Sequence, residues 1–581
     1  MHNYVKDIFM EYIISCSNAS RGYLSIQLSV DTENAAYLEL QLPAWRPGRY
    51  EMANYARNIQ KFRVMDHKGN ILPFQKIKKD RWRISCSDAS CIVVEYNYYA
   101  RQMDAGGSYL DEDLIYINFI NCLLYTDKQI NNKCRVILDI PSHYTIACGH
   151  PIRERILQAE NFYRLADSPL IAAPQIQSKS YTLKDTVFTI WLYGRITPDW
   201  SRLLSDFKRF TEAQLELMGD FPEKDYHFLL FILPYPHYHG VEHANSTVIT
   251  LGPDQRFEEK GFYDNLLGIS SHELFHAWNV CKIRPVELLP YDFSQENYFE
   301  TGYVAEGFTT YYGDLMLARS GVFSSTDYFN ELAILLKRHF ENFGRFNRSL
   351  TESSADLWVD GYIAGTPHRK VSIYVKGAVM ALFIDLWIRR HSQGRNSLDN
   401  VMQLLWIEFG KKNRGYTSSD IFDIIGRVTG FNAQHIYDRY INGTSDEEEE
   451  LNDLLNDIGC ELDKQPSNNL LERYYGLRVK TQGEKTLIDL IIPNSPADQA
   501  LSPGDEIVQI NQLPLNTSNL TELTQATSNE ICLVIQRNCI EHTYMLRPDN
   551  HEYFLVYSIQ KKEDADSNQK AAFKSWLHQD F

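Results

Sequence analysis

The sequence lacks both a long apolar run and any closely spaced pair of cysteines. No stretch approaches the roughly 18 consecutive apolar residues that a transmembrane helix requires, so we expect no membrane anchor. The ten cysteines are scattered and form no C-x-x-C pair, which predicts free thiols. The first residues contain no basic segment followed by an apolar core. We therefore expect no signal peptide and a cytoplasmic protein.

Positive charge is also scarce. There are 58 Lys and Arg against 75 Asp and Glu, for a net charge of -17. Nucleic acids and anionic membrane surfaces bind clustered basic residues, so neither is expected as a partner. The composition is that of a globular protein, 44% hydrophobic and 23% charged, over 581 residues. Because a single core stops growing at about 250–300 residues, several domains are expected, while the oligomeric state stays open.

Hydrophobic periodicity divides the chain into a multidomain α+β protein. Residues 1–178 alternate apolar and polar side chains between turn-rich segments, which predicts an N-terminal β-sandwich-like domain. We see no catalytic cluster there, and interpret residues 45–50 as a packed loop. Residues 179–460 change to a mainly helical pattern with a small sheet at the start. Residues 470–548 return to short strands, and residues 549–581 are interpreted as a C-terminal tail.

The helical part contains an H-E-x-x-H pattern formed by His272, Glu273 and His276, in a run without Gly or Pro. Side chains four apart on a helix lie about 5–6 Å apart at Cβ, so both imidazoles can bind one zinc ion. Glu273 stands beside them, placed to take a proton from the attacking water. The alternative is a surface helix with two histidines by chance, but the apolar neighbours favour a zinc hydrolase. Cys281, five residues beyond His276, lies off this face and is interpreted as a packing residue.

A catalytic zinc site has three protein ligands and one open position, so a third ligand is needed. Glu306 lies thirty residues after His276 in a second predicted helix, where Gly307 permits close packing. Three other carboxylates compete in the loop between them: Glu287, Glu296 and Glu300. A ligand is better held on a rigid element, which favours Glu306.

These segments resemble the glycyl aminopeptidase family of zinc metallopeptidases, gluzincins distantly related to the aminopeptidase N family. The resemblance rests on H-E-L-F-H-A-W-N-V followed by K-I-R-P, on V-A-E-G-F-T-T-Y-Y, and on W-R-P-G-R-Y at residues 45–50. It implies a β domain, a thermolysin-like catalytic domain and a PDZ domain, in that order. It further implies one zinc ion per chain, held by His272, His276 and Glu306, with Glu273 as general base.

The resemblance also implies a site for the substrate amine. The segment His239-Gly240-Val241-Glu242-His243 resembles the G-x-M-E-N segment of aminopeptidase N relatives, whose glutamate binds the free α-amine. Gly240, Val241, Glu242 and His243 are therefore expected to bind substrate, with His243 replacing the asparagine of those relatives. The surrounding stretch, 234–246, reads as irregular, and the alternative for Glu242 is an exposed loop carboxylate.

Those relatives carry a tyrosine in a Y-x-K-G segment that hydrogen-bonds the tetrahedral oxyanion. Tyr374, 68 residues after Glu306, begins the matching segment Y-V-K-G. One such donor contributes a few kcal/mol, on the order of other oxyanion donors. The alternative is a core tyrosine at the start of a helix.

The C-terminal module resembles a PDZ domain. S-P-A-D at 495–498 and P-G-D-E-I-V-Q-I-N at 503–511 match its central signature. Tyr475-Gly476-Leu477 matches its carboxylate-binding loop, which makes Gly476 and Leu477 candidate contacts for a peptide C-terminus that adds a strand to the sheet. The alternative is a domain that only docks on the catalytic half.

The resemblance predicts a zinc aminopeptidase that releases small N-terminal residues, Gly or Ala, from peptides with a free N-terminus. The preference for small residues comes from the family alone. One alternative is a zinc endopeptidase that the PDZ domain directs to C-terminal tails. The other is a non-catalytic PDZ-containing binding protein. The intact set of His272, Glu273, His276 and Glu306 argues against the last, because an inactive relative usually lacks one of them.

Overall fold

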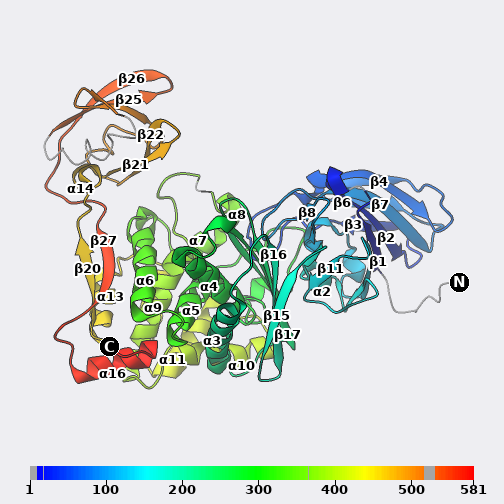
Figure 1. Ribbon diagram of the computed structural model, residues 1–581, viewed down its shortest axis with the longest axis horizontal. Coiled ribbons are helices and arrows are strands. Elements are labelled where there is room, and N and C mark those ends of the chain that lie inside the picture. The colour runs from blue at the N-terminus through cyan, green and yellow to red at the C-terminus, as the bar shows by residue number, and fades with distance from the viewer. Residues whose placement is uncertain (1–9, 18, 364, 516–529) are drawn as a thin grey trace.

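A computed structural model describes residues 10–17, 19–363, 365–515 and 530–581. Figure 1 shows three bodies in a row: a β-rich N-terminal domain in blue, a helical domain in green, and a small C-terminal β domain in orange. This is the mixed α+β architecture that the sequence predicts. Among the described residues, no helix has both the length and the apolar character needed to cross a membrane. Part of the expected C-terminal module, 516–529, lies outside the described residues.

The N-terminal domain consists of three sheets, because its strands bury every second side chain and need a second layer to cover that face. The sheet orders are β12-β13-β10-β1-β2-β7-β4, β3-β6-β5 and β11-β14-β9-β8. Phe62 on β4 stacks on Trp82 of β6 at 4.9 Å between ring centroids, which joins two of the sheets. The strands are β1 (Met10–Ser15), β2 (Tyr23–Asp31), β3 (Tyr37–Gln41), β4 (Ile59–Asp66), β5 (Phe74–Lys78), β6 (Arg81–Ser85), β7 (Cys91–Tyr99), β8 (Tyr109–Leu110), β9 (Ile115–Ile117), β10 (Cys134–Asp139), β11 (Thr145–Cys148), β12 (Ile152–Arg153), β13 (Ile156–Ala159) and β14 (Leu170–Ala173). The short helices are α1 (Phe119–Cys122) and α2 (Phe162–Ala166).

The helical domain begins with a five-stranded sheet of order β15-β16-β17-β19-β18. Its strands are β15 (Gln177–Leu183), β16 (Thr186–Gly194), β17 (Asp225–Ile232), β18 (His237–His243) and β19 (Ser246–Gly252). The sequence suggested that the stretch 234–246 is irregular, but the structure shows that it contains the strand β18. Residues 237–243 pair with β19 in antiparallel register along their whole length, and these backbone hydrogen bonds make a strand from a segment whose His and Gly content does not indicate one.

Helices cover this sheet and form the rest of the domain. They are α3 (Trp200–Met218), α4 (Lys260–Phe275), α5 (Thr309–Arg319), α6 (Ser325–Phe340), α7 (Leu350–Ala355), α8 (Leu357–Asp360), α9 (Val375–His391), α10 (Leu398–Glu408), α11 (Ser418–Thr429), α12 (Gln434–Ile436) and α13 (Glu448–Asn456), with π-helices η6 (Tyr303–Phe308) and η9 (Tyr437–Ile441). Helix α4 ends at Phe275. Val280 has φ +108°, a conformation that no α-helix contains, so the chain leaves the helix before that point.

The last residues of the chain are not the expected tail. Strand β20 (Cys460–Gln465) pairs antiparallel with β27 (Val556–Lys561), and helix α16 (Ser567–Leu577) returns to the helical domain. The indole N–H of Trp576 donates to the Tyr311 hydroxyl at 3.0 Å, and the Trp576 side chain is fully buried. Apolar burial therefore ties 549–581 to the helical domain, and the C-terminal β domain is an insertion between β20 and β27 (Figure 1).

The inserted domain has a sheet of order β21-β22-β23-β25-β26. Arg478, on its first strand, makes a two-pronged ion pair with Glu341 at the end of α6, with distances of 2.6 and 2.7 Å. The His368 ring lies 3.0 Å from the carbonyl oxygen of Ile491. These contacts attach the insertion to the helical domain. Its elements are α14 (Leu470–Tyr475), β21 (Leu477–Gln482), β22 (Lys485–Ile491), β23 (Glu506–Ile510), β24 (Leu513–Pro514), β25 (Ile531–Arg537) and β26 (Ile540–Leu546).

Candidate active site

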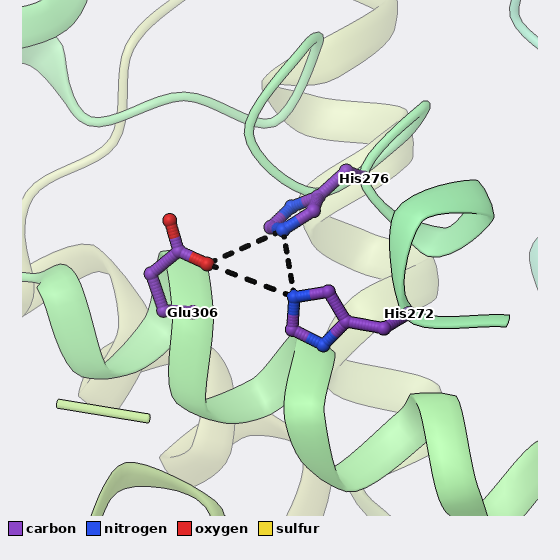
Figure 2. A group of neighbouring side chains, drawn as sticks. All are labelled: His272, His276 and Glu306. Atoms are coloured by element: carbon purple, nitrogen blue, oxygen red, sulfur yellow. Dashed lines mark hydrogen bonds and ion pairs between the residues drawn. The ribbon is translucent and has the colours of Figure 1, made fainter. Parts of the chain in front are cut away.

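The three predicted metal ligands converge at the end of α4 (Figure 2). The Nε2 atoms of His272 and His276 lie 3.1 Å apart. Glu306 Oε2 lies 3.2 Å from His276 Nε2 and 3.9 Å from His272 Nε2. His276 and Glu306 are almost fully buried, whereas His272 faces the cleft. One imidazole pair and one carboxylate, with an open side, form the donor set that a catalytic zinc ion requires.

A hydrogen bond on the side of the ring away from the metal site fixes the orientation of His276. Its Nδ1–H donates to the carbonyl oxygen of Asn279 at 2.7 Å, which leaves Nε2 free to act as a ligand. The side-chain amide of Asn279 donates in turn to the carbonyl oxygen of Val304 at 2.7 Å and to the Thr309 hydroxyl at 3.0 Å. Asn279 therefore links the turn after α4 to the segment that carries Glu306.

Glu306 lies in the π-helix η6, and glycines let neighbouring helices approach it. A Cβ at Gly307 would lie 2.4 Å from the Cα of Gly377 on α9, so both residues must lack a side chain at this crossing. Gly313 on α5 faces the backbone of His272 in the same way, with its ideal Cβ 3.1 Å from the His272 Cα. Gly307 thus permits a close helix approach, as expected, and the helix that approaches is α9. Gly313 permits the approach of α5 to the metal helix.

Electrostatics favour a cation among these side chains. Burial lowers the pKa of His276, but the carboxylates of Glu306, Glu242 and Glu273 outweigh it and raise this pKa to about 10. Burial and the neighbouring His276 hold the pKa of His272 well below its ordinary value. Three buried carboxylates around one imidazole thus create a demand for positive charge, which a divalent metal ion satisfies. The residues present fit zinc.

Glu273 lies next to the ligands and is 5% exposed. Burial raises the pKa of its carboxyl group well above the ordinary value, and the nearby Glu242 and Glu306 act in the same direction. Gly240 packs directly against the carboxylate, since a Cβ there would lie 2.3 Å from Glu273 Oε1. A carboxyl group with a raised pKa is suited to exchange a proton near neutral pH.

A cleft of about 500 Å³ opens in front of these residues. On one side it is lined by Gly240, His272, Glu273 and Tyr374. It continues between α4, α5 and α6 past further lining residues: Asp264, Asp314, Phe323, Glu331, Ile334 and Arg338. A cleft of this size admits several residues of a peptide.

The predicted amine-binding residues lie on strand β18, and their side chains have different surroundings. Glu242 is 6% exposed, and its oxygen atoms come within 4.8 Å of the ligand atoms of Glu273 and His276. Val241 is buried in an apolar core, and His243 turns to Asp167, with its Nδ1 2.8 Å from Asp167 Oδ1. Successive side chains of a strand point to opposite faces, so Val241 and His243 lie on the face opposite Glu242. Of the four predicted residues, Gly240 is the one that lines the cleft. Glu242 and His243 both line a second cavity, of about 350 Å³, between the N-terminal and helical domains.

Tyr374 immediately precedes α9 and lies over the metal ligands. Its ring centroid is 6.5 Å from that of His272. Its hydroxyl lies 3.4 Å from the hydroxyl of Tyr362, which also lines the cleft. Burial raises the pKa of Tyr374 well above its ordinary value, and Glu306 adds to this, so the phenol stays protonated as a hydrogen-bond donor.

No catalytic cluster was expected in the N-terminal domain, yet this domain reaches the cleft. Gly48 and Arg49 line it beside Gly240 and Tyr374. The guanidinium of Arg49 lies 5.2 Å from the ring centroid of Tyr362. The W-R-P-G-R-Y motif was the available signal, because a Trp and a Gly beside a proline suggest a fixed loop, but no sequence pattern shows which surface such a loop contacts.

The predicted peptide-binding residues of the inserted domain lie at its sheet edge. Gly476 ends α14 with φ +65°, and a Cβ there would lie 2.3 Å from the Cβ of Ser495, so both conformation and space require glycine. Leu477 begins β21 and is fully buried. Among the described residues, β21 pairs only with β22, which leaves one edge of the strand available for pairing with a peptide.

Three family models match the chain, in the order of the domains described above. Residues 11–174 match the Peptidase M61 N-terminal domain, 265–380 match the M61 glycyl aminopeptidase, and 467–536 match the PDZ domain. The M61 model spans the metal helix, Glu306 and Tyr374. The middle of the chain is therefore a zinc metallopeptidase domain of the glycyl aminopeptidase type, and the inserted domain is a PDZ domain.

A solved structure agrees with the fold. A crystal structure of an aminopeptidase N family protein from Idiomarina loihiensis matches with a TM-score of 0.89 at 24% identity, covering 98% of this chain and 100% of that one. An M1 zinc metallopeptidase from Deinococcus radiodurans matches with a TM-score of 0.47 at 13% identity, covering 76% and 94%. The first match shows that the whole three-domain arrangement recurs in another protein. Comparison with curated proteins finds no match.

Proposed function

We propose that this chain, an M61 metallopeptidase with an inserted PDZ domain, is a zinc aminopeptidase that releases small N-terminal residues, Gly or Ala, from peptides. The preference for small residues rests on the resemblance to glycyl aminopeptidases. The restriction to the N-terminal residue rests on the position of Glu242 relative to the metal ligands.

The distance between Glu242 and the metal site matches a single amino-acid residue. The nearest ligand atoms of Glu242 and His276 lie within 4.8 Å of each other. Within one residue the amine nitrogen and the carbonyl carbon are about 2.5 Å apart, and a second residue adds about 3.5 Å. An amine held by Glu242 therefore brings the first carbonyl group, and not the second, to the metal site. This spacing supports an aminopeptidase over an endopeptidase or a peptidase that removes dipeptides.

His272, His276 and Glu306 would hold one zinc ion per chain. When bound, zinc supplies a Lewis acid that polarises the scissile carbonyl and makes water a better nucleophile. Asn279 keeps His276 in the tautomer that presents Nε2, and the close packing at Gly307 holds Glu306 in place. The buried Glu242 binds the ammonium group of the substrate and fixes the distance between amine and carbonyl; the positive charge of this group offsets the burial that raises the pKa of the Glu242 carboxyl group.

Glu273 carries out the proton transfers, and Tyr374 stabilises the oxyanion. Glu273 takes a proton from the attacking water and returns it to the nitrogen of the leaving amine. Its buried position and raised pKa favour both steps near neutral pH. The hydroxyl of Tyr374 donates a hydrogen bond to the oxygen that becomes negative in the tetrahedral transition state.

Two partners follow from this proposal. The first is a peptide with a free N-terminus in the cleft. The second is a peptide C-terminus at Gly476 and Leu477, where it would extend the sheet at β21. All ten cysteines are free, which suits the reducing cytoplasm that the sequence suggested.

The proposal is tested with Gly-, Ala- and Leu-anilides and N-acetyl-Ala-anilide, using wild-type protein and Glu273→Gln. We expect zinc-dependent hydrolysis of Gly- and Ala-anilide, little of Leu-anilide, and none of the acetylated substrate. Glu273→Gln should keep its zinc and lose activity by about 10²–10⁴-fold. Equal rates for the two proteins would refute the catalytic assignment, and cleavage of the acetylated substrate would refute the aminopeptidase.

A further inference from the structure

We infer that residues 45–50 of the N-terminal domain form the wall of the amine-binding pocket, and that Gly48 sets the size of this pocket. The inference rests on the proposed function, because it concerns the same site. It assigns a specificity-determining residue to the N-terminal domain, which also lines the cleft with Arg49. Three features support this role: the contact of Gly48 with Glu242, the anchoring of the loop, and the state of the Glu242 carboxylate.

Gly48 touches the carboxylate that would bind the amine. An ideal Cβ at Gly48 would lie 2.3 Å from Glu242 Oε2, 2.8 Å from its Cδ and 2.9 Å from Oε1. Real Cβ atoms do not approach a neighbour so closely, so the side chain of Glu242 occupies the space that any other residue at 48 would need. Gly48 lines the catalytic cleft, while Pro47 and Glu242 line the cavity between the domains. The backbone at 47–48 therefore separates the two spaces beside Glu242.

The loop is firmly attached to the helical domain, so it behaves as a wall rather than a flap. The indole N–H of Trp45 donates to the carbonyl oxygen of Asp292 at 2.7 Å, and the Trp45 side chain is fully buried. Its ring packs edge-on against Trp358 at 5.1 Å and Tyr291 at 5.6 Å. The backbone N–H of Ala44 donates to the carbonyl oxygen of Phe293 at 2.7 Å.

The preceding residue is fixed as well. Arg46 is 4% exposed, donates to the carbonyl oxygen of Pro47 at 3.0 Å and lies 3.5 Å from His239 Nε2 on strand β18. Its guanidinium fills the space next to Gly106, where a Cβ would lie 2.2 Å from it. The strand that carries Glu242 and the loop that carries Gly48 are thus held together on both sides of the contact.

The Glu242 carboxylate is incomplete without a ligand. Its Oε1 is buried and, within the described part of the chain, has no hydrogen-bond partner. A buried carboxylate oxygen without a donor is costly, and a substrate ammonium group supplies the missing donor and the charge. Gly48, at contact distance, leaves the space beside the carboxylate free of a side chain, and this is where a primary ammonium group would bind. A nitrogen that carries an acyl group or a preceding residue would place atoms where the loop backbone lies. The wall thereby selects free N-termini.

The test compares two metal-binding probes in the full-length, zinc-loaded protein. Alanine hydroxamate carries an amine for Glu242, whereas acetohydroxamate binds the metal without one. The variant is Gly48→Ala, and the matched control is Gly69→Ala in the same domain. Gly69 has φ +85°, close to the +76° of Gly48, but no atom lies within 4 Å of its ideal Cβ. Both variants thus carry the same backbone strain, and only one creates a clash.

We expect Gly48→Ala to weaken alanine hydroxamate at least tenfold in calorimetric titrations and to leave acetohydroxamate within twofold of wild type. Gly69→Ala should bind both probes like wild type. Equal weakening of both probes by Gly48→Ala would show a general distortion and overturn the inference, as would wild-type affinity for alanine hydroxamate. If wild type hydrolysed no anilide while the amine-dependent difference persisted, the proposed activity would fail and the pocket assignment would stand.

Discussion

His276 donates its Nδ1–H to the backbone carbonyl of Asn279, three residues further along the chain, at 2.7 Å. The bond closes a turn directly after α4 and fixes which nitrogen of the ring faces the metal site. Because the amide of Asn279 also holds the carbonyl oxygen of Val304, two residues before Glu306, one residue outside the ligand set aligns two ligands from different helices. The asparagine of H-A-W-N is thereby part of the metal site.

Asn279→Ala is expected to weaken zinc binding by about 10–100-fold, the usual effect of removing a partner of a metal ligand. The alanine backbone still accepts from His276, but the turn loses its hydrogen bonds to Val304 and Thr309. Competition with a chromogenic chelator measures the affinity. The control is Asn58→Ala, which removes a 3.0 Å hydrogen bond to Tyr98 in the N-terminal domain. Unchanged zinc affinity in Asn279→Ala would refute this role.

Tyr374→Phe is expected to lower kcat by about 10²–10³-fold with little change in KM, because an oxyanion donor acts mainly in the transition state. Tyr362→Phe removes only the neighbouring hydroxyl, 3.4 Å away, and should cost less than about tenfold if it only orients Tyr374. Steady-state kinetics on Ala-anilide distinguish the two. A rise in KM with unchanged kcat in Tyr374→Phe would mean that the phenol binds the ground state and the transition state equally well.

The convergence of His272, His276 and Glu306 and the order of the domains were predictable because they depend on local spacing and on strong motifs. His272 and His276 are fixed by helical periodicity alone, and the structure places Glu306 beside them rather than Glu287, Glu296 or Glu300. The change from period two to helical periodicity puts the predicted end of the N-terminal domain at residue 178, beside the start of β15 at Gln177. In each case the information lies within a few residues of the feature.

The remaining features depend on contacts between distant segments. Strand β18 exists because β19 pairs with it, and Val241 and His243 lie on the face opposite Glu242 because of that strand. Residues 549–581 looked like a tail because a single strand and a single helix carry no sign of the domain to which they return. Gly48 reaches Glu242 across nearly 200 residues of sequence, and no local pattern encodes such a contact.

A buried ion pair outside the active site is expected to make stability depend on pH in the acid range. Glu447 is fully buried next to His339, whose Nε2 contacts Glu447 Oε1, with Lys376 and Arg345 nearby. Burial raises the pKa of Glu447, but these positive groups outweigh it and lower this pKa to about 2. The unfolded value is about 4.3. The depressed value means that this contribution to stability is fully present above about pH 4.3 and is lost as the pH falls towards 2.

Glu447→Gln should therefore destabilise the protein at neutral pH by about 3–5 kcal/mol, because it leaves buried positive groups without their partner. Thermal unfolding should show a clearly lower midpoint, and the difference from wild type should shrink as the pH falls below about 4. The control is Glu408→Gln at the exposed pair with Arg427, 2.9 Å apart, where a change of about 1 kcal/mol or less is expected. Equal midpoints for the two variants would contradict the buried pair's role.

The position of the PDZ domain as an insertion allows a precise excision. Gln465 at the end of β20 and Val556 at the start of β27 are direct antiparallel partners. A two-residue Asn-Gly turn is the favoured connection between strands in this register. Replacing residues 466–555 with Asn-Gly should therefore leave β20, β27 and α16 in place. Among the described residues, the excision removes the Arg478–Glu341 ion pair, the hydrogen bond between His368 and Ile491, and the packing of Leu555 against the core of the helical domain.

We expect the excised protein to be folded, to bind zinc, and to hydrolyse Ala-anilide within about threefold of wild type. Truncation after residue 548 keeps the PDZ domain but removes α16, so it should fail to yield folded protein. The reason is apolar burial: Phe573, Trp576 and Leu577 are completely buried in the core of the helical domain, and each contributes on the order of 1.5–3 kcal/mol. Circular dichroism and zinc content of the two proteins give the answer. A folded, active truncation would mean that the chain end is dispensable. An inactive but folded excision would mean that the PDZ domain takes part in catalysis.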